Sequence, residues 1–140
     1  MKKTDENKAM AQRFYSEVIN SHNVGGVKSF VTTDFIDHNP NPGHTGKGMD
    51  DLAAQLSEMF TAVPDFHITA DFMIAEEDTV VAYLTMTGTN TGPYGKLPAS
   101  NKPVKINGID IVHIKDGKAT ERWGVFDDLS FMTQIGVVNA

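Results

Sequence analysis

The apolar positions in the first half of the chain recur at helical spacing. Met10, Phe14 and Val18 follow one another every four residues, which predicts one buried face of a helix. Thr4 can cap this helix, because a hydroxyl oxygen accepts hydrogen bonds from the free N–H groups of a first turn. We expect the helix to end near residues 21–23.

Two further helices are predicted before the chain becomes strand-like. A short one is expected around residues 24–31, and an extended segment follows at 35–39, before Pro40. The clearest helix begins at about Gly48 and is closed by Pro64. Its apolar face consists of Met49, Leu52, Ala53, Leu56, Met59 and Phe60.

In the second half, apolar and polar residues alternate, as they do in strands with one buried face. Strands are expected at residues 65–74, 79–89, 104–115 and 119–127. Asp116-Gly117, between the last two, is a strong hairpin signal. A closing helix is predicted by Leu129, Met132 and Ile135.

This order, helices first and strands afterwards, predicts an α+β fold in which N-terminal helices pack on a curved antiparallel sheet. Where the helices cover the sheet only in part, a pocket is expected at its open end. With 140 residues and one core, residues 1–140 are expected to form a single domain.

Composition and charge exclude several classes of function. The formal net charge of -6 argues against nucleic acid and against anionic membrane surfaces as partners. The chain has no cysteine, so thiolate catalysis and cysteine-ligated metals are excluded. Five scattered histidines lack the spacing of a metal site. No signal peptide or membrane span is recognised, so a cytoplasmic location is expected.

Asp110 is the strongest candidate for chemistry. It lies in Gly-Ile-Asp-Ile-Val-His-Ile, a strand that is otherwise apolar, where an ionisable group is costly to bury unless it is paired or functional. It is either a pocket acid or the structural partner of Arg122. A three-residue loop with a bulge at Gly117 would set Asp110 opposite Arg122 and near Gly124, and we favour it. A two-residue turn would set Asp110 opposite Trp123.

Two groups of further residues are candidates for the pocket. His38 and Asn39, before Pro40, can polarise a substrate oxygen or can cap a loop as an Asx turn. Asp37 is expected to be their structural partner. Aromatic side chains of the strands can form a wall for a planar ligand, or core and dimer contacts. The aromatic candidates are Tyr83, Trp123 and Phe126.

Short motifs along most of the chain carry a resemblance to a known family. They are Asp37-His38-Asn39-Pro40, Pro64-Asp65-Phe66-His67, Met73-Ile74-Ala75-Glu76, Gly88-Thr89-Asn90-Thr91-Gly92, Gly108-Ile109-Asp110-Ile111, Asp116-Gly117-Lys118, Glu121-Arg122-Trp123 and the tail 127–136. In this order and spacing, over about residues 10 to 136, the chain resembles the SnoaL-like polyketide cyclase (ester cyclase) family of the nuclear transport factor 2-like superfamily.

The resemblance implies a cone-shaped barrel with an open cavity for a small apolar molecule. Cyclases of the family close a ring by intramolecular aldol chemistry without a metal or organic cofactor. Together, the residues and the resemblance give Asp110, His38 and Asn39 as candidate catalytic residues, with Asp110 as the stand-in for the family's acid. The candidate substrate-binding residues are Asp37, Tyr83, Arg122, Trp123 and Phe126. A homodimer through the open sheet face is also implied, with Val81, Tyr83 and His113 as contacts.

The sequence departs from the family at two places. Many family cyclases carry an acid directly after the tryptophan of the last strand, where this chain has Gly124. Asn39 stands where the related ketosteroid isomerases carry an acid that moves the proton. Three hypotheses therefore stay open: a cyclase or isomerase, a non-catalytic module that binds a small molecule, and a dimerising protein with a vestigial pocket.

Overall fold

The computed structural model describes residues 2–139. Its first helix, α1, spans Lys3–Phe14 and continues into a π-helical turn, η1, at Tyr15–Ile19. A short 3-10 helix, η2, covers Val24–Ser29. Two more helices follow, α2 at Met49–Ala62 and α3 at Asp128–Gln134. The predicted helices are confirmed, but Thr4 lies inside α1 and does not cap it, since α1 begins one residue earlier.

Five strands form one sheet, in the order β1-β5-β4-β3-β2. They are β1 at Val31–Asp37, β2 at His67–Glu76, β3 at Thr79–Thr89, β4 at Pro103–Lys115 and β5 at Lys118–Phe126. The four strands β2 to β5 form the predicted antiparallel meander.

The sheet has one strand more than the predicted meander, because β1 pairs in parallel with β5. Val31, which we expected on a helix, is the first residue of this strand. Val31, Phe35 and Asp37 are its buried residues. The long connection through α2 and three strands lets β1 and β5 run in the same direction.

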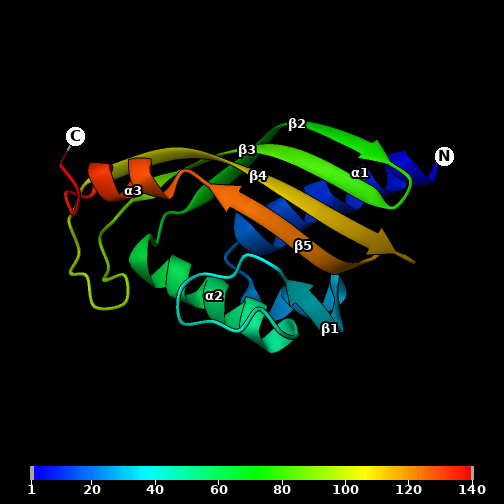
Figure 1. Ribbon diagram of the computed structural model, residues 1–140, viewed down its shortest axis with the longest axis horizontal. Coiled ribbons are helices and arrows are strands. Elements are labelled where there is room, and N and C mark those ends of the chain that lie inside the picture. The colour runs from blue at the N-terminus through cyan, green and yellow to red at the C-terminus, as the bar shows by residue number, and fades with distance from the viewer. Residues whose placement is uncertain (1, 140) are drawn as a thin grey trace.

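The helices α1 and α2 lie beneath the curved, unclosed sheet (Figure 1). The inner face of β3 supplies Val80, Ala82, Leu84 and Met86 to the core, and every second residue is only half-buried. The opposite, outer face of the sheet carries exposed apolar side chains, among them Phe72, Ile74, Ile109, Ile111 and Val125. None of the helices in residues 2–139 is long and apolar enough to cross a membrane.

The turn between β4 and β5 decides which residues face the core. Asp116 and Gly117 both have positive φ, 52° and 80°, so they form a two-residue turn of the kind that joins twisted strands. A register shift between His113 and Ile114 follows, and Asp110 comes to lie opposite Gly124. The favoured three-residue loop was wrong, and so was the pairing of Asp110 with Trp123, because the bulge lies inside the strand pair rather than at Gly117.

Candidate functional site

A cavity of about 100 Å³ lies between the helices and the inner face of the sheet. Most of its wall is apolar, with side chains such as Met10 and Phe35. Its polar residues are Tyr15, Asp37, Asn41, Gln55, Asp110 and Arg122. The sequence predicted this pocket, and four of the candidate site residues line it: Asp37, Asp110, Arg122 and Phe126.

Asp110 is a buried carboxylate with a partner on each oxygen. The hydroxyl of Tyr15 donates to Oδ2 at 2.8 Å, and Nε of Arg122 donates to Oδ1 at 2.9 Å. Burial and the neighbouring Asp110 raise the pKa of Tyr15 well above its usual value, so the phenol keeps its proton at neutral pH. Asp110 thus accepts one neutral and one charged hydrogen bond at the cavity wall.

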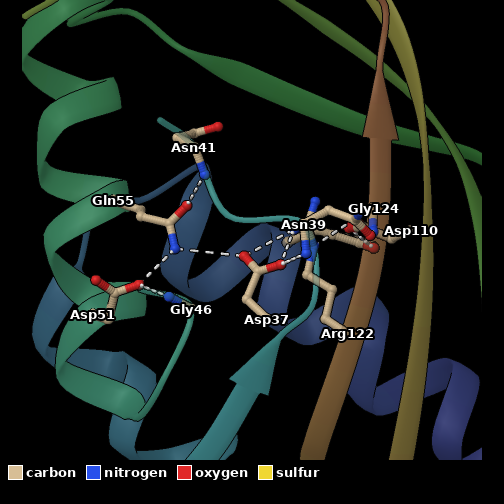
Figure 2. Close-up of polar contacts among 10 residues, drawn as sticks. Asp37, Asn39, Asn41, Gly46, Asp51, Gln55, Asp110, Arg122 and Gly124 are labelled. Atoms are coloured by element: carbon tan, nitrogen blue, oxygen red, sulfur yellow. Dashed lines mark hydrogen bonds and ion pairs between the residues drawn. The ribbon is translucent and has the colours of Figure 1, made fainter. Parts of the chain in front are cut away.

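Arg122 joins Asp110 to Asp37. Its Nη1 donates to Oδ1 and Oδ2 of Asp37 at 2.9 and 3.0 Å (Figure 2). Although burial opposes the charged form, Asp110 and Asp37 raise the pKa of Arg122, so the guanidinium stays charged. Two carboxylates and one guanidinium give this cluster a formal charge of minus one beside an apolar cavity.

Two inward-facing glycines make room for large side chains of β5. A Cβ atom at Gly124 would overlap the guanidinium of Arg122, and one at Gly108 would overlap the ring of Phe126. The guanidinium carbon lies 5.2 Å from the centre of that ring, a cation–π contact. The position of the family's acid is therefore covered by the end of Arg122.

The polar cluster extends outward along α2. Gln55 Nε2 donates to Asp51 Oδ2 at 3.0 Å, and its contact with Asp37 Oδ2 is 3.5 Å (Figure 2). His44 lies 3.2 Å from Asp51 Oδ1 and 2.7 Å from Glu58 Oε2. Although His44 lies in the loop before α2, its side chain is only 15% exposed.

His38 and Asn39 do not reach the cavity. The Asn39 side chain accepts from the backbone N–H of Gly124 at 3.2 Å. The backbone N–H of Asn39 donates to Asp37 Oδ1 at 3.0 Å, so the Asx turn is formed by Asp37 and not, as expected, by Asn39. His38 stacks on Trp123 with ring centres 4.5 Å apart and lies 2.7 Å from Glu121. The geometry places this predicted catalytic pair at the edge of the sheet, away from the cavity lining.

Tyr83 and Trp123 lie on the outer face of the sheet. Tyr83 stacks on Phe72 with ring centres 5.3 Å apart, and Trp123 meets His113 edge to face at 4.7 Å. Successive side chains of a strand point to opposite faces, and the residues before and after Tyr83 and Trp123 in the sequence face inward. Neither Tyr83 nor Trp123 is among the described residues that line the cavity.

Sequence reasoning missed Tyr15 and Gln55. Tyr15 follows Ala11 by four residues on the buried stripe of the first helix, so a hydroxyl on that stripe was the available signal. Gln55 is buried on α2 beside Leu56. Both are polar residues on an apolar helix face.

A second cavity of about 80 Å³ adjoins the first. It extends toward α3, and Tyr94, Val104 and Phe131 contribute to its wall. The residues that line both cavities are Asn41, Met59, Phe66, Met86 and Phe126. The two spaces therefore share part of their wall. In residues 2–139, no group of three or more histidine and acidic side chains is arranged to hold a metal ion.

The helix-covered, unclosed sheet and its cavity define a protein of the nuclear transport factor 2-like fold class. The model of the family described as SnoaL-like polyketide cyclase matches residues 9–135, and the chain belongs to this family. None of the curated protein sequences compared matches the chain.

Solved structures agree with this assignment. A candidate polyketide cyclase from Bacillus cereus ATCC 10987 is 30% identical, with a TM-score of 0.82 over 95% of this chain and 82% of its own. TsrD from Streptomyces laurentii is 24% identical, with a TM-score of 0.86 over 99% of this chain and 100% of its own. A candidate SnoaL-like polyketide cyclase from Jannaschia sp. CCS1 is 21% identical, with a TM-score of 0.86 over 99% and 97%. The last two similarities show the fold alone.

Proposed function

We propose that this protein is a cofactor-independent enzyme that removes a carbon-bound proton from a small, largely apolar carbonyl compound. The reaction class is an intramolecular aldol ring closure or a related isomerisation. The observation that carries the proposal is the buried carboxylate of Asp110 in the wall of a mostly apolar cavity. The membership of the SnoaL-like family supports the same chemistry.

In this proposal Asp110 is the general base. An aldol closure needs a base that takes a proton from the carbon beside a carbonyl group, and groups that stabilise the enolate. Asp110 is held in one orientation by Tyr15 and Arg122, so the base is oriented before substrate binds. After the new carbon–carbon bond forms, the protonated Asp110 returns its proton to the product oxygen.

The size of the cavity indicates the substrate class. An engineered apolar cavity of about 150 Å³ holds one benzene molecule. The first cavity is smaller than this, at about 100 Å³, but it shares five lining residues with the second. A compound with one ring and a short chain that occupies both spaces fits better than a rigid polycyclic compound.

Exchange of carbon-bound protons tests the proposal without knowledge of the natural substrate. Monocyclic ketones and β-dicarbonyl compounds are incubated with the protein in D₂O, and the loss of α-proton signal is followed by NMR. We expect faster exchange than in buffer, and a fall of at least ~100-fold in Asp110→Asn. The matched control is Asp71→Asn, because the exposed Asp71 carboxylate on β2 accepts a hydrogen bond from Thr85 of β3 and lies outside the cavity lining. Equal exchange by the folded Asp110→Asn protein would exclude the proposed role.

A second candidate is a non-catalytic module that binds the same class of molecule. It is favoured by two observations: both oxygens of Asp110 already accept hydrogen bonds, and Gly124 stands at the family's acid position. Saturable binding of a ketone with no proton exchange would favour this candidate. A Δ-isomerase would show exchange and a shifted double bond in an unsaturated ketone.

A homodimer through the outer face of the sheet belongs to the same proposal. Exposed apolar residues are expected at such an interface, and Phe72 and Ile74 are 56% and 60% exposed. Tyr83 lies beside them and His113 borders Trp123 on the same face. We expect the dimer to act in the cytoplasm on a small molecule, without nucleic acid or membrane as a partner.

A further inference from the structure

Arg122 uses only part of its hydrogen-bonding capacity within the protein. A guanidinium donates from Nε, Nη1 and Nη2. Nε donates to Asp110 and Nη1 to Asp37. Within residues 2–139, no hydrogen bond engages Nη2.

This free nitrogen is not sealed inside the protein. In the described part of the chain, the only buried side-chain nitrogen or oxygen without a partner is Nδ2 of Asn7. Nη2 of Arg122 is therefore open to solvent or to the contents of the cavity that Arg122 lines. A donor of this kind on a charged side chain can bind an oxygen of a ligand.

Gly124 gives Nη2 its position. Gly124 pairs with Asp110 across the strands, and Nη2 is the atom that a Cβ at Gly124 would overlap most closely. The guanidinium end therefore lies over the inner face of β5, directly beside the carboxylate (Figure 2). A Cβ atom at this position would require Nη2 to shift from its place.

We propose that Nη2 of Arg122 donates a hydrogen bond to the carbonyl oxygen of the substrate, and that Gly124 keeps the space that this contact needs. The inference rests on the proposed function and adds the group that polarises the substrate carbonyl and stabilises the enolate. It identifies the substrate as a carbonyl compound whose acidic carbon lies at Asp110 while its oxygen lies at Arg122.

The charges balance through the step. The carbon–hydrogen bond breaks, the proton goes to Asp110, and the electron pair moves to the substrate oxygen, which becomes an enolate. The formal charge of the site stays the same, because the negative charge passes from Asp110 to the enolate. The guanidinium then faces the enolate with less competition from Asp110, and it is already in place when the charge develops.

A coloured enolate mimic tests this contact directly. 4-Nitrophenol carries one ring and an ionisable oxygen, and its phenolate is distinguished from the phenol by absorbance. We measure the ratio of phenolate to phenol in the bound state at constant pH, together with the dissociation constant. Wild-type protein is expected to raise this ratio above that in buffer, with the proton held by Asp110.

Gly124→Ala is the key variant, since it displaces Nη2 but removes no charge. We expect the ratio of bound phenolate to bound phenol to fall at least ten-fold in Gly124→Ala. It should fall further in the double variant Arg122→Gln/Asp37→Asn, which removes one positive and one negative charge. The control is Gly25→Ala, where the nearest atom to a new Cβ is 3.7 Å away, and its ratio should equal that of the wild type. Thermal unfolding of each variant confirms that it is folded.

An unchanged ratio in folded Gly124→Ala would overturn the inference, as would wild-type protein that binds phenolate no better than phenol. The proposed function is tested separately by proton exchange in Asp110→Asn. If Asp110→Asn loses exchange while Gly124→Ala keeps both exchange and phenolate ratio, Asp110 remains the base and Arg122 has no contact with the oxygen.

Discussion

At the scale of single residues, the site contains one buried guanidinium that pairs with two carboxylates. Arg122 holds two carboxylates with distances of 2.9 to 3.0 Å, and its own side chain is only 15% exposed. The removal of one member of a buried ion pair leaves an uncompensated charge and destabilises the folded state strongly. Exposed ion pairs are worth far less, because solvent screens them.

This difference can be measured by one pair of variants. We expect Arg122→Met to lower the free energy of unfolding by about 3–5 kcal/mol, since Asp37 and Asp110 lose their partner. Arg13→Met is the control: Arg13 pairs with Glu17 on the surface, its side chain is 62% exposed, and the change should stay below about 1 kcal/mol. Urea unfolding at neutral pH gives both values, and equal losses would contradict the buried-pair account.

Gly108 offers a second test of packing at the cavity. An alanine there would push the ring of Phe126 toward the cavities that it lines. We expect Gly108→Ala to cost about 1–3 kcal/mol of stability and to weaken ketone binding, as overpacked cores do. Gly25→Ala again serves as the control. Ketone affinity that does not change, measured by calorimetry, would show that Phe126 can move without cost.

At the scale of elements, the contacts of His44 fix the loop before α2 on that helix. His44 bridges Asp51 and Glu58, which lie two turns apart on α2. The hydrogen bond with Glu58 and the contact with Asp51 outweigh burial and raise the pKa of His44 above its ordinary value of 6.5. The protonated histidine is therefore the form that the folded protein stabilises.

The sign of the pH dependence follows from this raised pKa. The stabilisation by His44 is fully present below about pH 6.5 and is lost as the pH rises through the raised value. We expect His44→Gln to lower the unfolding free energy by up to about 1 kcal/mol near pH 6 and by much less near pH 9. His67→Gln, an exposed position, is the control. A loss that is the same at both pH values would rule out the charged bridge.

At the scale of the whole molecule, the two faces of the sheet differ in what covers them. The inner face forms the cavity, while the outer face exposes Phe72, Ile74, Ile109, Ile111 and Val125. A contiguous apolar face of this kind is typical of an interface between copies of a chain. Trp123 and Tyr83, which we expected to line the pocket, lie on this outer face with their aromatic partners.

The dimer can be tested by one charge on that face. We expect wild-type protein to sediment as a dimer, and Phe72→Glu to sediment as a monomer, because the like charge would be buried on both sides of a symmetric interface. Asp71→Asn, next to it in the sequence, should remain dimeric. A wild-type monomer at concentrations well above those of the assay would remove the dimer from the proposal.

The sequence by itself determined the order of helices and strands, the pocket beneath the sheet and the presence of one carboxylate, Asp110, in an otherwise apolar strand. Each of these follows from periodicity or from the cost of a charge in an apolar strand. Only the tertiary structure decided the parallel pairing of β1 with β5, the bulge that sets Asp110 opposite Gly124, and the arrival of Tyr15 at the same carboxylate. These depend on contacts between residues far apart in the chain. A shift of one residue in the register turns every side chain of a strand to its other face, so local pattern cannot fix them.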